Sequence, residues 1–89
     1  MEENFENAVT IYPNPVSDML NIEIIADASQ NNVVKLYDMS GRMIKEMHVQ
    51  SDMGINTVQL SMNEFTTGIY TLQVYANEKL VSTSKVTKK

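Results

Sequence analysis

Apolar and polar residues alternate along most of the chain. In residues 20–24, LNIEI, every second position is aliphatic, and the positions between them hold Asn and Glu. A period of two is typical of half-buried β-strands. Comparable runs, rich in β-branched, aromatic or long apolar residues, recur between Gly, Asn, Asp or Ser. The pattern predicts strands at residues 9–11, 20–24, 33–39, 42–49, 55–60, 69–75 and 80–87.

No part of the sequence keeps a helical spacing of three and four over a dozen positions with caps at both ends, although residues 61–65 are compatible with one short turn. An 89-residue chain has room for one hydrophobic core. The expected fold class is therefore all-β, a seven-stranded antiparallel immunoglobulin-like β-sandwich without the Cys and Trp of antibody domains. Methionines at alternate strand positions, such as Met43 and Met47, are expected to fill the core.

Two tight turns are predicted from residues that tolerate unusual backbone conformations. Ser40 and Gly41 separate two strand patterns. Gly41 can take the positive φ that a tight hairpin needs, and Ser40 can bond its own backbone. Residues 76–79 predict a second hairpin between the last two strands, with Asn77 as the left-handed residue.

The segment YPNPVSD, residues 12–18, contains two prolines around one asparagine. Pro13 and Pro15 each fix φ and lack a backbone donor, and each favours an extended conformation in the residue before it. Such a segment cannot continue a central ladder. We expect it to leave the first strand at Tyr12, to form a rigid corner between the two sheets, and to enter the second strand near Asp18.

Charge is distributed unevenly along the chain. The formal net charge is -4, which argues against a nucleic-acid partner, because phosphate backbones are bound by clustered Lys and Arg. Every acidic residue lies at or before Glu78, whereas Lys79, Lys85, Lys88 and Lys89 follow it. These lysines form either a polar edge strand that ends in solvent or an interaction tail.

No stretch is apolar for long enough to predict a transmembrane segment. The first residues, MEENFENAV, lack the basic flank and the apolar centre of a secretory leader, so no leader is expected in this chain. A C-terminal piece of a longer exported protein has the same appearance.

Candidate chemistry is sparse. His48, the one histidine, has no nucleophile or ligand partner at a recognisable spacing and is expected to be an exposed strand residue. The chain has no cysteine, and no zinc or calcium motif occurs. We therefore expect a protein that is not an enzyme, with no catalytic residue, metal or cofactor. A calcium site is a minor alternative to solvated loop acids, and its ligands would be Asp18, Asp27, Asp38 and Asp52.

Three segments resemble the successive blocks of one protein family. They read YPNPVSDMLNIEI, VKLYDMSGRMIKEM and LSMNEFTTGIYTLQVYANEKLVSTSKVTKK. In this order and spacing, and with a basic C-terminus, they are similar to the type A C-terminal sorting domain carried by cargo proteins of the type IX secretion system (Por secretion system) of Bacteroidetes. The resemblance covers residues 8–89, and residues 1–7 are expected to be a linker or sequence added for expression.

The resemblance implies an addressing function and no reaction. Cargo of this family reaches the periplasm with an N-terminal leader, and shuttle and translocon components recognise the C-terminal domain there and pass the cargo through the outer membrane. A gingipain-like sortase peptidase then normally removes the domain, and the cargo reaches the cell surface or the medium. The oligomeric state is left open, because an exposed edge strand permits both a monomer and an edge-strand dimer.

The resemblance also assigns roles to individual positions. Gly41 and Gly68 are turn residues, Arg42 is the candidate exposed contact, and Tyr70 belongs to a core strand. The terminal block matters for export in this family. Asn77 and Glu78 stand where the family often has a glycine, so the type of this turn stays open. The matching positions are Tyr12, Pro13, Asn14 and Pro15 in the opening motif; Asp38, Gly41 and Arg42 in the central hairpin; Gly68 and Tyr70 in the third block; and Lys85, Val86, Thr87, Lys88 and Lys89 in the terminal block.

A retained adhesion or carbohydrate-binding β-sandwich module is the alternative from a different class. It requires an exposed aromatic platform on which sugar rings stack. The chain has 2 Phe, 4 Tyr and no Trp, and most of these lie at predicted core or turn positions. The secretion signal is therefore the favoured interpretation.

Overall fold

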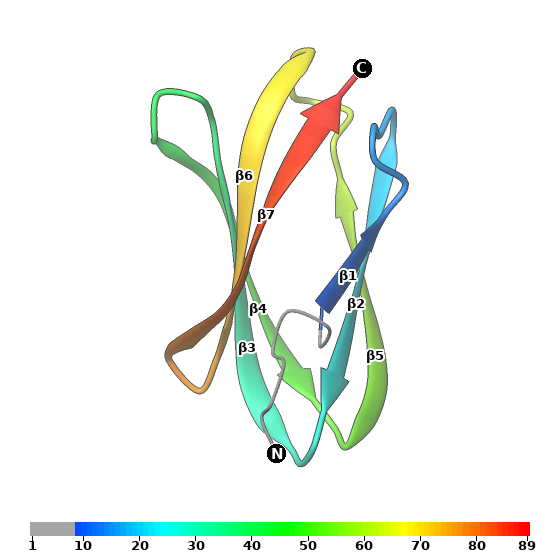
Figure 1. Cartoon of the computed structure of the whole chain (residues 1–89), viewed down its shortest axis with the longest axis vertical. Coiled ribbons are helices and arrows are strands. Elements are labelled where there is room, and N and C mark those ends of the chain that lie inside the picture. The colour runs from blue at the N-terminus through cyan, green and yellow to red at the C-terminus, as the bar shows by residue number, and fades with distance from the viewer. Residues whose placement is uncertain (1–8) are drawn as a thin grey trace.

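The computed structural model describes residues 9–89, which fold into two antiparallel β-sheets packed face to face (Figure 1). All seven predicted strands are present, and residues 9–89 contain no helix. No helix in this described range is therefore long and apolar enough to cross a membrane. The strands are β1 (Val9–Tyr12), β2 (Met19–Ala26), β3 (Gln30–Tyr37), β4 (Met43–Ser51), β5 (Gly54–Ser61), β6 (Gly68–Ala76) and β7 (Lys79–Lys88).

The strand order of each sheet identifies the sandwich. One sheet has the order β1-β2-β5 and the other β4-β3-β6-β7, and all neighbouring strands are antiparallel. In constant-type immunoglobulin domains the fourth strand belongs to the sheet of the first, second and fifth strands. Here β4 pairs with β3 instead, from Gln30 opposite Ser51 to Tyr37 opposite Met43. The other six strands keep the immunoglobulin arrangement, so the predicted seven-stranded immunoglobulin-like sandwich is confirmed.

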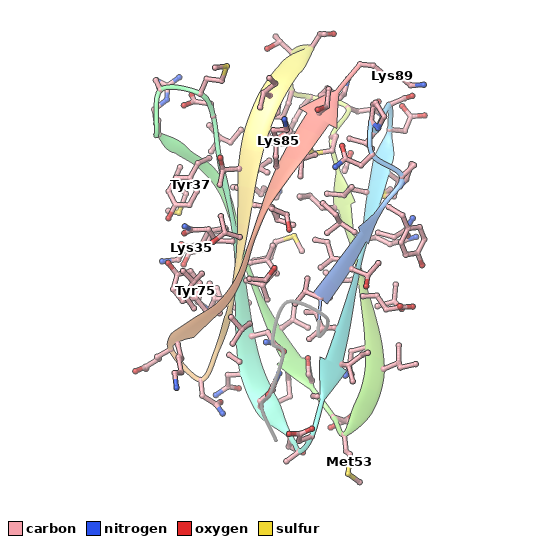
Figure 2. The ribbon with its side chains drawn as sticks, viewed as in Figure 1. Lys35, Tyr37, Met53, Tyr75, Lys85 and Lys89 are labelled. Carbon is pink, nitrogen blue, oxygen red and sulfur yellow. The ribbon has the colours of Figure 1, made fainter. Side chains whose placement is uncertain are left out.

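The larger sheet separates apolar from polar side chains in the way that alternation predicts. On β3, Val34 and Leu36 are buried, and Lys35 and Tyr37 lie on the outer face. Figure 2 shows Tyr37, Lys35 and Tyr75 of β6 in a row on the outside of this sheet, with Lys35 between the two tyrosines. The Nζ atom of Lys35 lies 4.8 Å from the ring centroid of Tyr75, which is a cation–π contact.

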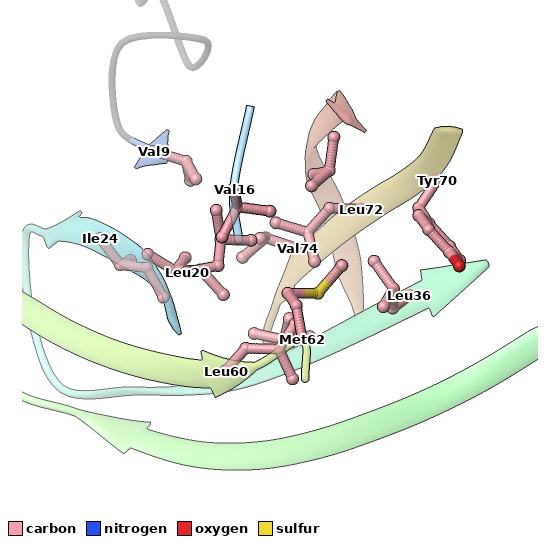
Figure 3. Packing of buried hydrophobic residues seen from close by; sticks show 13 residues of the cluster. Val9, Val16, Leu20, Ile24, Leu36, Leu60, Met62, Tyr70, Leu72 and Val74 are labelled. Carbon is pink, nitrogen blue, oxygen red and sulfur yellow. The ribbon is translucent and has the colours of Figure 1, made fainter. Parts of the chain in front are cut away.

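The core lies between the two sheets and takes side chains from both (Figure 3). Removal of this apolar surface from water is the main favourable term in folding. Two core residues come from connections rather than strands: Val16 between β1 and β2, and Met62 after β5. The most deeply buried apolar residues are Val16, Leu20, Ile22, Ile24, Val34, Leu36, Leu60, Met62, Leu72, Val74 and Val86.

A β-bulge near the start of β4 changes which side chains face the core. The register shifts between Leu36 and Tyr37, and this shift gives β4 one extra residue. Ile44 and Met47 therefore both pack against the core, whereas Met43 is 44% exposed. The prediction that methionines fill the core was right for Met47 and wrong for Met43, because one extra residue reverses the alternation. The other exposed methionines in residues 9–89 are Met19, Met39 and Met53.

One buried polar contact closes the end of the sandwich that holds the β2–β3 and β4–β5 turns. Asn32 and Ser51 are both buried, and the Ser51 hydroxyl donates to the Asn32 side-chain oxygen. The Asn32 amide group donates to the Tyr75 carbonyl at 2.9 Å. Buried polar groups must be hydrogen-bonded to be tolerated, and these contacts link β3 to both of its neighbours.

The β6–β7 hairpin uses two left-handed residues. Asn77 has φ 49° and Glu78 has φ 71°, which is the combination of a type I′ turn. The prediction for Asn77 is confirmed, and the left-handed Glu78 was not predicted. Asn77 also contacts Asn31 twice: its backbone N–H donates to the Asn31 carbonyl at 2.8 Å, and its side-chain oxygen accepts from the Asn31 N–H at 3.1 Å.

Candidate recognition surface

Parts of all three sequence blocks that resemble the sorting domain lie at one end of the sandwich. Lys88 pairs with Gly68 of β6 and also forms a parallel bridge with Val16. The Met62 N–H donates to the Asp18 carbonyl at 2.7 Å, so the β5–β6 connection contacts the start of β2. We call this end, at the top of Figure 1, the carboxyl-terminal pole; it comprises residues 13–18, 38–42, 62–70 and 85–89.

Asn14 binds the backbone of the last strand through its side chain. Its Nδ2 donates to the Lys85 carbonyl at 2.9 Å, and its Oδ1 accepts from the Thr87 N–H at 3.0 Å. An amide that donates and accepts in this way replaces one residue of a neighbouring strand. The Asn14 side chain therefore extends the ladder on the free side of β7.

Val16 continues this pairing with its own backbone. Its N–H donates to the Thr87 carbonyl at 2.8 Å, and its carbonyl accepts from the Lys89 N–H at 3.0 Å. The Val16 side chain is completely buried in the core. We call the contacts of Asn14 and Val16 with β7 the clasp. The clasp satisfies four successive backbone groups on the free edge of β7, from the Lys85 carbonyl to the Lys89 N–H.

The clasp corrects the prediction for residues 12–18. The segment was expected to be a corner that crosses between the sheets, but β1 and β2 pair in the same sheet, from Val9 opposite Ile24 to Tyr12 opposite Asn21. The segment leaves that sheet, contacts the edge of the other sheet and returns. Pro13 and Pro15 are exposed in it, and both of the peptide bonds before them are cis.

The β3–β4 turn is organised by one carboxylate. Oδ1 of Asp38 accepts from the Ser40 N–H and the Arg42 N–H at 3.0 Å each, and from the Ser40 hydroxyl at 2.7 Å. Gly41 adopts φ +88°, which confirms its predicted turn role. The hydrogen bond from the Ser40 hydroxyl, followed by that from the Arg42 N–H, lowers the pKa of Asp38 below its ordinary value of 3.8.

Arg42 is displayed at the tip of this turn. Its side chain is 77% exposed, and its Nη2 lies 3.4 Å from Oδ2 of Asp38. An exposed ion pair of this kind contributes little to stability. The guanidinium is therefore accessible to a partner.

Tyr70 fixes the connection into β6. Its ring is buried, and its hydroxyl donates to the Thr66 carbonyl at 2.5 Å. The ring of Phe65 lies 6.0 Å away, centroid to centroid, in a tilted arrangement. A tyrosine near the start of the sixth strand that bonds the backbone a few residues upstream is the tyrosine corner of immunoglobulin-like domains. The prediction placed Tyr70 in the core and missed the role of its hydroxyl.

The C-terminal lysines divide between the two ends of β7. Lys79 pairs with Ala76 beside the β6–β7 turn, whereas Lys85, Lys88 and Lys89 lie at the carboxyl-terminal pole. Figure 2 shows Lys85 and Lys89 near that end. The side chains of Lys85 and Lys89 are exposed, and Lys88 is half-buried. The predicted edge strand is therefore real, but its last residues are paired on both sides.

The aspartates of the alternative calcium site are divided between the two ends of the sandwich. Asp18 and Asp38 lie at the carboxyl-terminal pole, whereas Asp27 and Asp52 lie in turns at the opposite end. Within residues 9–89, no group of three or more His, Cys, Asp or Glu could hold a metal ion. The alternative calcium site is therefore wrong.

His48 is 72% exposed and lies 3.3 Å from Glu46, as expected for a surface strand residue.

Within residues 9–89, the aromatic residues do not gather into one exposed platform for sugar rings. Lys35 already covers the ring of Tyr75, and Tyr70 is buried. Tyr12 is exposed on the other sheet, away from Tyr37. The aromatic residues in this range therefore give no support to the retained carbohydrate-binding module.

Sequence reasoning missed two residues that build the pole. Val16 was assigned only to the predicted corner of residues 12–18, and Met62 only to the possible short turn of residues 61–65, yet both are completely buried. Each is an isolated aliphatic or thioether side chain, with Val16 between Pro15 and Ser17 and Met62 between Ser61 and Asn63. That isolation is the signal that could have marked them as single anchors of a connection.

These features define an immunoglobulin-like β-sandwich that displays a clasped C-terminal strand. The sequence model of the secretion system C-terminal sorting domain matches residues 10–89. The chain therefore belongs to this family of type IX secretion sorting domains.

A solved structure supports the fold. The crystal structure of dimeric latent PorU from Porphyromonas gingivalis is similar, with a TM-score of 0.80 and 20% sequence identity over 90% of this chain. The chain spans 9% of that protein, so the likeness concerns the fold of one part of it. No curated protein matches the chain.

Proposed function

We propose that this domain directs its parent protein from the periplasm through the type IX outer-membrane translocon to the cell surface or the medium. The observation that carries the proposal is that parts of all three matched sequence blocks lie at the carboxyl-terminal pole. Segments far apart in the sequence form one surface there, and this surface exists only in the folded domain. The domain acts as an address and catalyses no reaction.

The proposed recognition residues fall into two groups. One group contacts the partner through exposed or half-buried charged and aromatic side chains, and the other group holds the surface in shape. The first group is Tyr12, Arg42, Lys85, Lys88 and Lys89. The second group is Pro13, Asn14, Pro15, Asp38, Gly41, Gly68, Tyr70, Val86 and Thr87, and Thr87 acts through its backbone.

The partners are periplasmic shuttle and outer-membrane translocon components of the type IX system. After passage, a sortase-like peptidase at the cell surface removes the domain. We place the cut before β1, and residues 8–89 form the sorting domain. The proposed linker, residues 1–7, lies outside the residues that the structure describes.

Export of a fluorescent reporter tests this function. The reporter carries a periplasmic leader and the whole 89-residue chain at its C-terminus, in a bacterium with a working type IX system. We expect the reporter at the surface or in the medium, shortened by about the 10.1 kDa mass of the chain. A reporter that stays in the periplasm contradicts the sorting function, and an exported reporter of full length contradicts removal.

Charge variants locate the surface that is read. Replacement of Lys85, Lys88 and Lys89 by Gln removes positive charge at the pole and keeps the backbone contacts of the clasp. Lys79→Gln is the matched control, because Lys79 is exposed on the same strand at its other end. We expect reduced export for the triple variant only. Equal loss in both proteins would place recognition elsewhere.

A further inference from the structure

From the Lys85 carbonyl to the Lys89 N–H, the backbone groups of the last strand are bonded on both sides. On one side β7 pairs with β6, with Ile69 opposite Thr87 and Gly68 opposite Lys88. On the other side Asn14 and Val16 bond the Lys85 carbonyl, both backbone groups of Thr87 and the Lys89 N–H. A partner strand could add to this edge only by displacing the clasp, because β-strand addition needs unpaired N–H and C=O groups.

We propose that the export machinery recognises side chains of the last strand while the clasp is closed. In this proposal Asn14 is the positioning residue, because it holds the strand that presents these side chains. This inference rests on the proposed sorting function. The side chains offered are those of Lys85, Lys88 and Lys89, and no acidic residue follows Glu78. The surface that fits them is a protein surface rich in Asp and Glu, since opposite charges favour encounter and fix the orientation of docking.

The alternative mechanism makes the opposite demand on the structure. If the C-terminal residues had to leave the sandwich and bind as an extended peptide, the clasp and the β6 pairing would both have to open. A covalent bond between β6 and β7 would then block recognition. If the strand is read in place, the same bond is harmless.

Ile69→Cys with Thr87→Cys supplies that bond. The two residues are direct partners on antiparallel strands, where Cα atoms are about 4.5–5.5 Å apart, within the range that a disulfide bridges. The chain contains no other cysteine that could compete. The single variants Ile69→Cys and Thr87→Cys carry the same side-chain changes without the bond and are the matched controls.

We expect the oxidised double variant to be exported within twofold of the unaltered fusion, with the disulfide present in the exported protein. Export of both single variants without export of the oxidised double variant would overturn the inference. If the unaltered fusion itself stays in the periplasm, the sorting function fails together with this inference. The two failures are therefore distinguishable.

Asn14→Ala tests the positioning role. It removes both side-chain contacts with β7 and leaves every lysine in place. We expect faster hydrogen exchange of the Thr87 amide and at least fivefold lower export, with export restored when the 69–87 disulfide is added. Asn63→Ala is the control, because it removes an exposed asparagine from the same pole without altering the clasp, and it should be exported normally. Normal export of Asn14→Ala, or no restoration by the disulfide, would refute the role of Asn14.

Discussion

The side-chain oxygen of Asn14 accepts a 3.0 Å hydrogen bond from the backbone N–H of Thr87, which lies 73 residues further along the chain. The contact joins the first connection of the sandwich to its last strand. Because the partners are so far apart in sequence, it forms only when the C-terminal residues have taken their place on β6. The clasp therefore reports that the whole domain is folded.

The stability contribution of the clasp is measurable. We expect Asn14→Ala to lower the free energy of unfolding by about 1 kcal/mol, since two hydrogen bonds are lost at an exposed site where water replaces them. Asn63→Ala, an exposed asparagine at the same pole, should change it by less than about 0.5 kcal/mol. Urea unfolding of both variants checks this, and equal effects would argue that the Asn14 contacts add nothing to stability.

The tyrosine corner makes a separate prediction. Tyr70→Phe keeps the buried ring and removes the hydroxyl that donates to the Thr66 carbonyl, so we expect a loss of about 1 kcal/mol in the free energy of unfolding. Tyr37→Phe removes a hydroxyl from the outer face of β3 and serves as the control. Denaturant melts of the pair decide the matter. A Tyr70→Phe variant as stable as the unaltered protein would mean that the corner bond is not stabilising.

The strands could be predicted because burial imposes a period of two that is visible in the sequence. Residues 20–24 alternate strictly, and Leu20, Ile22 and Ile24 are all buried in β2. The bulge in β4 could not be predicted, since one inserted residue leaves each local pattern intact and only the pairing with β3 reveals it. Met43 was misplaced for this reason.

The candidate site could be predicted in its members but not in its arrangement. The family resemblance supplied Asn14 and Thr87 as separate motif positions, and no local pattern links them. Prolines indicate only that a segment cannot continue a central ladder. They do not indicate which sheet residues 12–18 contact, so the path of this segment was predicted wrongly. The partner of Asn14 is set by long-range packing, in which Val16 anchors the segment in the core.

The central turn depends on the backbone freedom of Gly41. At φ +88° any side chain is strained, although a Cβ atom added to Gly41 would meet no other atom within 4 Å. Gly41→Val should therefore lower stability by about 1–2 kcal/mol and loosen the hairpin. Gly68→Ala has equal space and no left-handed backbone, and it should be well tolerated. Thermal unfolding and export of the two variants test this, and similar losses in both would show that backbone conformation at Gly41 is unimportant.

Asp38 predicts a dependence of stability on pH. Its folded-state pKa lies below 3.8 because the Ser40 hydroxyl and the Arg42 N–H bond the carboxylate, so its contribution is complete well above pH 3.8 and declines as the pH falls through the lowered pKa. Asp38→Asn keeps an acceptor and loses the titration. Between pH 6 and about pH 2.5, the stability advantage of the unaltered protein over Asp38→Asn should shrink. An advantage that stays constant over this range would contradict the lowered pKa.

The lysines at the end of the chain should matter for export and not for folding. Lys89→Ala keeps the backbone N–H that donates to Val16, and the Lys88 side chain makes only a 3.4 Å contact with the neighbouring carbonyl. We therefore expect the double variant Lys88→Ala, Lys89→Ala to have a free energy of unfolding within about 0.5 kcal/mol of that of the unaltered domain. We also expect it to be exported poorly. Val86→Ala is the opposite case on the same strand. Its side chain is completely buried, so it should lose roughly 2 kcal/mol of stability. A large loss of stability in the lysine variant would show that the charged end is a structural element. It would then no longer be a candidate for recognition by the export machinery.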